Sequence, residues 1–252
     1  MNYPKINIGT LLIDNVSMQE TLEAIERLIA DGKPAYITNP NVDTIVRYNR
    51  DAEFAKFYNE GVLCVPDGMF ILWASRFLGT PLKEKVSGSD LVPQVCKLAD
   101  AKSYKLFFLG GRPGAAQAAK EQLKKSLFNL NVIGTYAPPL GFEKDEVELK
   151  KIVSMIKDAK PDILFVGLGA PKQERWIKRY YQELGVPVCM GVGVTFEFIA
   201  GIVKRAPKWM QKTGLEWFWR LCMEPGRLWK RYLVEDMQIF RIIFKQKMKR
   251  NK

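Results

Sequence analysis

The chain has 252 residues, of which 39 are Lys or Arg, 27 are Asp or Glu and none is His, so its net charge is +12. Hydrophobic residues make up 47% and charged residues 26%, which excludes a disordered chain, a collagen-like repeat and a polytopic membrane protein. Without histidine, proton transfer must use a carboxylate, a thiol, Lys or Tyr.

The cysteines and the first residues bear on cellular location. The four cysteines have no CxxC spacing, so we expect reduced thiols of a cytosolic protein and neither a zinc site nor a disulfide framework. Residues 1–15 lack the basic and apolar pattern of a secretory signal. The longest near-apolar run, residues 186–203, contains Glu197 and several glycines, so no transmembrane helix is predicted.

Short apolar runs alternate with helical patterns through the first 202 residues. Six of these runs predict β-strands, at residues 35–38, 62–65, 105–109, 132–136, 163–168 and 187–192. Such alternation predicts an α/β fold with a mostly parallel, Rossmann-like sheet and covering helices. Ligands of these folds bind beyond the carboxyl ends of the strands. Polar or glycine-rich segments follow four of the runs, at residues 38–41, 66–68, 110–114 and 169–174.

Asp67 directly follows the second predicted strand. A lone carboxylate there could accept a proton from a substrate hydroxyl. It could equally cap a helix over residues 68–78, because aspartate is a preferred N-cap residue. The lack of histidine favours the catalytic interpretation.

Gly110 and Gly111 begin a glycine-rich segment after the third strand. Free backbone N–H groups at a helix start, with Pro113 in the first helical turn, favour a phosphate or nucleotide contact over an ordinary tight turn. A dinucleotide is not favoured, because residues 132–138 offer no acidic ligand for a ribose.

Thr38, Asn39, Asn41 and Gln173 lie in the remaining polar segments. The amides could bind sugar or base groups, or serve only local turns and caps. Lys85 could meet a phosphate or remain a solvated surface charge.

The last fifty residues change in character, which predicts a core over residues 1–202 and an appendage over 203–252. Residues 203–252 hold 14 Lys and Arg, 4 Asp and Glu, and four of the six tryptophans. Two stripes at helical spacing predict amphipathic helices. The first stripe contains Trp209, Thr213, Trp217 and Leu221, and the second contains Trp229, Leu233, Met237, Phe240, Phe244 and Met248.

Three surfaces could receive these stripes: the parent core, an anionic membrane or another subunit. Basic residues with Trp and Phe favour the membrane surface. Nucleic acid is not expected as a partner, because the tail has no recognisable nucleic-acid module and no stacking platform.

Six segments taken together resemble the WecG/TagA/CpsF glycosyltransferases. They are TNPN at 38–41, VPDG at 65–68, KVSGSD at 85–90, FLGG at 108–111, GLGAPKQE at 167–174 and EPGRL at 224–228. The resemblance covers almost the whole chain, including the tail. It implies a GT-E type core and a C-terminal appendage that completes the site at the membrane.

The resemblance also implies a reaction. An N-acetylmannosamine-type sugar would pass from a UDP donor to polyprenyl-diphosphate-linked N-acetylglucosamine, with inversion and with no metal or other cofactor. The product would be the teichoic-acid linkage unit or a related surface polysaccharide. The protein would then be cytoplasmic and peripheral on the inner face of the cell membrane.

Residue roles follow from the same resemblance. Asp67 matches the general base, Asn39 and Gln173 fall in pocket segments, and Arg220, Arg227 and Arg231 match arginines that engage diphosphate. Many relatives have arginine where this chain has Lys85, which keeps the charge and loses the bidentate fork. Two other classes stay open from the residues alone: a nucleotide-dependent oxidoreductase and a non-enzymatic basic binding module.

Overall fold

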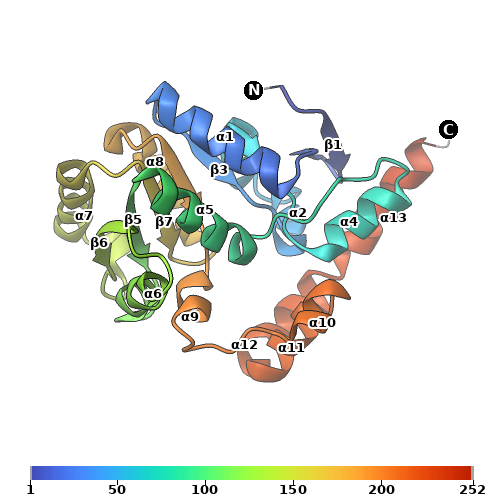
Figure 1. Ribbon diagram of the computed structural model, residues 1–252. Coiled ribbons are helices and arrows are strands. Elements are labelled where there is room, and N and C mark those ends of the chain that lie inside the picture. The colour runs from blue at the N-terminus through green and yellow to red at the C-terminus, as the bar shows by residue number, and fades with distance from the viewer. Residues whose placement is uncertain (1, 251–252) are drawn as a thin grey trace. The chain divides into compact units, whose positions relative to one another are not determined.

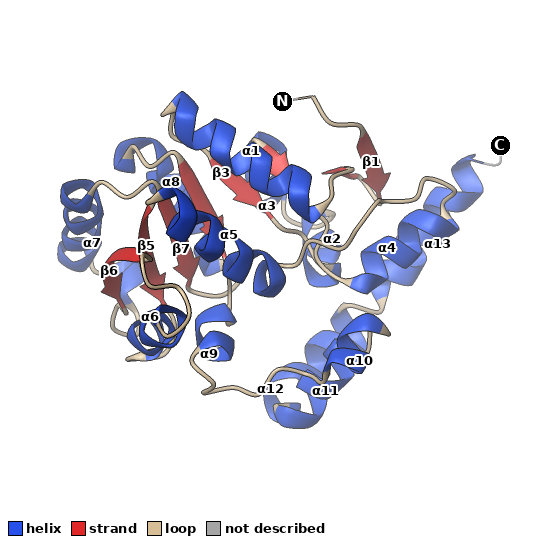
Figure 2. Ribbon diagram, viewed as in Figure 1, coloured by secondary structure: helices blue, strands red, loops and turns tan. Residues whose placement is uncertain are grey.

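The computed structural model describes residues 2–250, apart from the side chains of Arg227 and Arg250, and it has an α/β fold (Figures 1 and 2). The main sheet has the order β4 (Leu63–Cys64), β3 (Tyr36–Thr38), β8 (Val188–Gly191), β7 (Ile163–Gly167), β5 (Lys105–Gly110) and β6 (Asn131–Tyr136). The register of β3 with β8, β8 with β7, β7 with β5 and β5 with β6 is parallel. Each predicted run overlaps one of these strands, and the ends differ by at most one residue, so the predicted fold class is confirmed.

The chain divides into two compact units. One comprises residues 1–18, 39–87 and 204–252, and the other comprises residues 19–38 and 88–203. The basic tail therefore groups with two earlier segments of the chain, while the boundary at residue 202 stays a prediction.

The unit of residues 19–38 and 88–203 carries most of the sheet. Its helices are α1 (Met18–Asp31), α5 (Gly88–Lys102), α6 (Ala115–Lys124), η1 (Phe142–Lys144), α7 (Glu146–Ala159), α8 (Lys172–Leu184) and α9 (Thr195–Ile199). Every residue of β7 is buried, as an apolar strand covered on both faces should be. Phe108 of β5 stacks on Phe196 of α9 with ring centroids 4.9 Å apart, which anchors α9 beside the strand ends.

The other unit begins with an antiparallel hairpin that the sequence patterns did not predict. Its strands are β1 (Lys5–Ile8) and β2 (Leu11–Asp14), which pair through four residues each. Three helices follow in this unit: α2 (Val42–Tyr48), α3 (Ala52–Glu60) and α4 (Met69–Phe77). Asp14 is buried and accepts a hydrogen bond from the Cys64 N–H at 2.8 Å, which ties β2 to β4.

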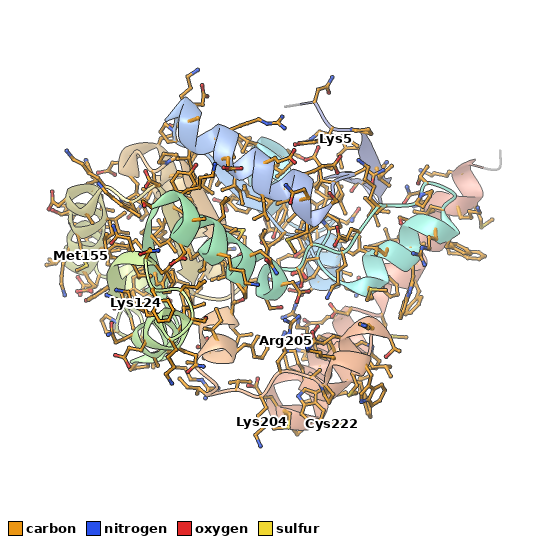
Figure 3. All side chains as sticks on the ribbon, in the orientation of Figure 1. Lys5, Lys124, Met155, Lys204, Arg205 and Cys222 are labelled. Atoms are coloured by element: carbon orange, nitrogen blue, oxygen red, sulfur yellow. The ribbon has the colours of Figure 1, made fainter. Side chains whose placement is uncertain are left out.

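The tail is helical, as predicted, but its helices are short. They are α10 (Lys208–Lys212), α11 (Glu216–Met223), α12 (Pro225–Lys230), the π-helix η2 (Arg231–Glu235) and α13 (Gln238–Arg250). The first stripe does not form one helix, because Gly214 has φ +69°. A Cβ on Gly214 would lie 2.4 Å from the Trp73 ring, so packing requires glycine there. Arg205, labelled in Figure 3, donates to Glu216 at 2.9 Å and holds the start of α11.

The second apolar stripe is a little more than half exposed. Its members are 52–61% exposed: Trp229, Leu233, Met237, Phe240, Phe244 and Met248. The buried residues of α12 and α13 are instead Leu228, Ile239 and Ile243. Phe240 nevertheless packs edge-on against Phe70 of α4, with ring centroids 5.4 Å apart, so packing on the parent core holds for this part of the stripe.

The structure also bears on the cysteines, on membrane-spanning helices and on metal ligands. All four cysteines are free: Cys64, Cys96 and Cys189 are buried, and Cys222 on α11 is exposed (Figure 3). Within residues 2–250, no helix combines the length and apolar character that a bilayer crossing needs. Over the same residues, Cys, Asp and Glu side chains do not gather in groups of three that could hold a metal ion.

Candidate active site

Three of the polar segments come together in the unit that holds the tail. The Asp67 N–H donates to the Pro40 carbonyl at 3.1 Å, and the Val86 N–H donates to the Pro66 carbonyl at 2.8 Å. These two backbone hydrogen bonds join the segments that carry Asn39, Asp67 and Lys85. Asn39 and Lys85 are 46 positions apart in the sequence, and the fold brings their segments together.

Asp67 is not the N-cap of the following helix. Helix α4 begins at Met69 and its N-cap is Gly68, which has φ +106° and makes no capping side-chain hydrogen bond. The capping interpretation of Asp67 is therefore wrong. Its half-buried carboxylate lies on a short segment between β4 and α4, and its role as a base stays a prediction.

The two asparagines near Asp67, Asn39 and Asn41, differ in their hydrogen bonds within the protein. Asn41 is the N-cap of α2, and its side-chain oxygen accepts from the Thr44 N–H at 3.1 Å and the Thr44 hydroxyl at 3.2 Å. Only its amide N–H₂ is left for a ligand. Asn39 is half-buried and makes no side-chain hydrogen bond within the described part of the chain, so its whole amide is available.

The tail arginines are also unequal. Arg220 lies on α11 and is half-buried. Arg227 lies on α12, but its side chain is outside the described residues. Arg231 begins η2 and its Nη2 lies 3.4 Å from Asp43 Oδ2, with Nε 4.0 Å from Asp236 Oδ2. Asp43 thus pairs with the Arg231 guanidinium, whereas the approach to Asp236 is too long for a hydrogen bond, and Arg231 Nε is buried without a hydrogen-bond partner among the described residues.

Arg231 belongs to a buried ionic network that joins the tail to α2. Asp43 also pairs with Arg47 at 3.5 Å, and both Asp43 and Asp236 are less than a tenth exposed. Burial raises the pKa of Asp236 to about 7, against the opposing effect of Arg231. Breaking a buried pair of this kind leaves an uncompensated charge, so the network fixes where η2 lies on this unit.

The other unit holds the glycine-rich segment. Gly110 has φ +100°, and a Cβ there would lie 2.7 Å from the Gly167 carbonyl, so no larger residue fits. The Gly111 N–H donates to that same carbonyl at 2.8 Å. Helix α6 starts at Ala115 after Gly114, so Pro113 precedes the helix and the predicted place of Pro113 in its first turn is wrong.

Glu197 lies against this segment and was not singled out as a site residue. Its Oε1 accepts from the Arg112 N–H at 2.9 Å, and its side chain is buried. Its Oε2 is also buried and has no hydrogen-bond partner among the described residues. The Glu197 carboxylate takes up the Arg112 N–H group and repels other anions. The glycine-rich segment is therefore better suited to a ligand's hydroxyl or N–H group than to a phosphate. The signal in the sequence was a single acid within an apolar run.

Gln173 lies over the end of β8, and Thr38 ends β3; both side chains are buried. The Gln173 oxygen accepts from the Gly193 N–H at 3.0 Å, and its nitrogen donates to Glu174 at 3.0 Å. A Cβ on Gly191 would lie 2.6 Å from the Gln173 nitrogen, so Gly191 makes room for this amide. Gln173 thus has internal partners at both ends, and its contact with a substrate stays a prediction.

Comparison with known proteins assigns the chain to a family. The family model described as "Glycosyl transferase WecG/TagA/CpsF family" matches residues 6–252. A relative from Staphylococcus aureus (strain MW2) is 31% identical over 91% of this chain and 87% of its own length. One from Bacillus subtilis (strain 168) is 27% identical over 94% of this chain and 90% of its own length. Both are named N-acetylglucosaminyldiphosphoundecaprenol N-acetyl-beta-D-mannosaminyltransferase. The resemblance seen in the six segments is thereby confirmed, and the chain belongs to the WecG/TagA/CpsF family of glycosyltransferases.

Proposed function

We propose that this chain transfers N-acetylmannosamine, or a closely related sugar, from its UDP derivative to N-acetylglucosaminyl-diphospho-undecaprenol. The names of its relatives state this acceptor and this transferred sugar. The product serves as the linkage unit of teichoic acid or of a similar surface polymer.

One observation carries the proposed chemistry: backbone hydrogen bonds join the Asp67 segment to those of Asn39 and Lys85. In a protein without histidine, a half-buried aspartate is well suited to accept the proton of the acceptor hydroxyl. The acceptor oxygen attacks the anomeric carbon of the donor sugar as the bond from that carbon to UDP breaks. Attack from the face opposite UDP inverts the anomeric configuration.

The departing UDP gains negative charge, which fixed cations can stabilise. Lys85, Arg220 and Arg227 are the cationic residues that we assign to this task. Arg231 instead serves the ionic network with Asp43 and Asp236, and we propose that it positions the tail. With these cations in place, the reaction needs no metal ion.

The tail brings the enzyme to its lipid-linked acceptor. Its exposed apolar stripe and its basic residues suit the interface of an anionic membrane, where aromatic side chains and Lys or Arg both find favourable surroundings. We therefore place the protein peripherally on the inner face of the cell membrane.

The decisive experiment measures UDP release from UDP-N-acetylmannosamine. We expect release only when a lipid-diphosphate N-acetylglucosamine acceptor is present, and at an unchanged rate when EDTA is added. UDP-glucose and NAD serve as comparison ligands. Acceptor-independent release, or tight NAD binding without affinity for UDP, would contradict the proposed activity, and full loss of activity in EDTA would contradict metal independence alone.

A further inference from the structure

A large basic cavity lies in the unit that holds the tail, between the β1–β2 hairpin, the end of α2 and helix α13. Its volume is about 1070 Å³. Five basic residues line it: Lys5, Arg50, Arg241, Lys245 and Lys249. No Asp or Glu is present among the described residues that line it. None of the residues assigned above to sugar transfer lines it either.

Among the described residues, most of these cations have no acidic partner. Lys5 pairs with Asp14 at 3.3 Å. Within residues 2–250, however, Arg50, Arg241, Lys245 and Lys249 make no ion pair with an acidic side chain. All four side chains are exposed, so solvent screens part of their mutual repulsion, and an anionic ligand shared by them would relieve the rest.

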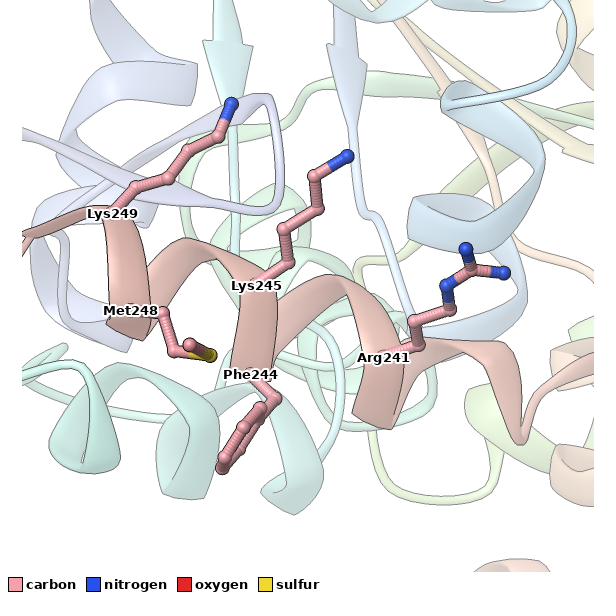
Figure 4. Close-up of a pocket in the computed structure, with 5 residues that line it drawn as sticks. All are labelled: Arg241, Phe244, Lys245, Met248 and Lys249. Atoms are coloured by element: carbon pink, nitrogen blue, oxygen red, sulfur yellow. The ribbon is translucent and has the colours of Figure 1, made fainter.

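Helix α13 presents this basic side next to its exposed apolar stripe. Arg241, Lys245 and Lys249 recur at a spacing of four and point to one side of the helix, whereas Phe244 and Met248 point to another (Figure 4). Phe244 is 61% and Met248 55% exposed. The same helix therefore offers cations to an anion and, beside them, apolar surface to hydrocarbon.

We propose that this cavity binds the phosphate of an anionic phospholipid headgroup. The planar guanidinium groups of Arg50 and Arg241 suit two oxygens of a phosphodiester, and the lysines add point charges. Phe244 and Met248 then lie among the acyl chains of the same leaflet. The inference rests on the proposed membrane role of the tail and adds a defined headgroup site contributed partly from outside the tail.

The test compares two double variants that remove equal charge from tail helices. K245Q/K249Q removes two lysines of the cavity, and K208Q/K212Q removes two exposed lysines of α10 at the same spacing, away from the cavity. Binding to phosphatidylglycerol and phosphatidylcholine vesicles is measured by sedimentation. We expect K245Q/K249Q to weaken phosphatidylglycerol binding about fivefold or more beyond K208Q/K212Q. Equal weakening by the two doubles would show diffuse attraction and overturn the headgroup site.

A third variant, Arg50→Gln, probes the side of the cavity outside the tail. We expect weaker phosphatidylglycerol binding and unchanged phosphatidylcholine binding, and no effect would overturn the proposal. Inorganic phosphate is the soluble comparison: if it raises the Tm of the wild type but not of K245Q/K249Q and displaces the vesicles at millimolar concentration, the occupant is a soluble phosphate and not a lipid.

A parallel measurement separates this inference from the proposed function. UDP release with a water-soluble acceptor should be the same in all three variants. If the wild-type protein does not bind phosphatidylglycerol vesicles, both the headgroup site and the membrane role are wrong. Failure of UDP release in the wild type would overturn the transferase alone.

Discussion

For Asp67, the structure separates two roles that the sequence left open. In the sequence, base and helix cap were evenly matched, because both need an acid before a helix. The structure gives the cap position to Gly68. Glu197 was noticed only as an interruption of an apolar run, since the hydrogen bond that it accepts from Arg112, 85 residues away, has no trace in local sequence.

Asp67→Asn is the sharpest test at the residue scale. An amide cannot accept the acceptor proton, so the rate of UDP release should fall by roughly 10²–10⁴ with little change in Tm. Asp31→Asn, at the exposed end of α1, is the matched control and should keep full activity. An Asp67→Asn enzyme that works at a near-normal rate would remove Asp67 from the mechanism.

At the scale of elements, a helix or strand was predictable when its own residues specify it, and was missed when it is short or when a distant residue determines it. All six strands of the main sheet were predicted. The inner strands, such as β7, are apolar because both of their faces are buried, whereas the edge strand β6 is half-buried and was found from its β-branched residues. The β1–β2 hairpin was missed, since four-residue strands such as Lys5–Ile8 carry too little pattern. The break at Gly214 was missed because the Trp73 ring, 141 positions earlier, imposes it.

The ionic network between α2 and η2 predicts a pH dependence of stability. The unfolded chain releases the Asp236 proton near its ordinary pKa of 3.8, and the folded chain does so near 7. Folding therefore takes up a proton between these values, and the stability contributed by Asp236 falls as the pH rises through this window. Arg231 and Arg47 oppose this shift, while Asp43 and Glu235 reinforce it.

Asp236→Asn should remove that dependence, because an amide does not titrate. Between pH 5 and pH 8 these two pKa values correspond to a stability loss of ~2–3 kcal/mol, so we expect the Tm of the wild type to fall by roughly 5–10 °C more than that of the variant. Calorimetry at several pH values measures it. Glu53→Gln, an exposed acid on α3, should follow the wild type, and a wild-type curve parallel to that of Asp236→Asn would refute the assignment.

At the scale of the whole molecule, the charge and aromatic content of the tail can be read directly from the sequence, whereas the bounds of its helices cannot. Its charge and aromatic content indicated an interface. Its stripe positions Phe244 and Met248 are indeed exposed, but its helices are shorter than the stripes implied. The two units also divide the candidate site residues, which no linear pattern indicated.

Substituting Phe244→Ser and Met248→Ser together tests the tail as an anchor. Both side chains are more than half exposed, so the free energy of unfolding should change little. Binding to phosphatidylglycerol vesicles should fall on the order of tenfold or more, since each apolar side chain contributes up to ~1.5–3 kcal/mol when removed from water. Cys222→Ser, also on the exposed surface of the tail, is the control. Unaltered vesicle binding by the double variant would exclude the stripe as the contact.

Gln246 on α13 has a consequence for how this protein can be shortened. Its side chain accepts from the Gly9 N–H at 2.7 Å and donates to the Asn7 carbonyl at 2.8 Å, while Ile242 packs against the same hairpin turn. Deleting the residues after 202 would therefore also remove the contacts that Gln246 and Ile242 make with the N-terminal hairpin. A deletion protein that aggregates or melts early would report a damaged N-terminus as much as a missing anchor, so point substitutions are the cleaner tool.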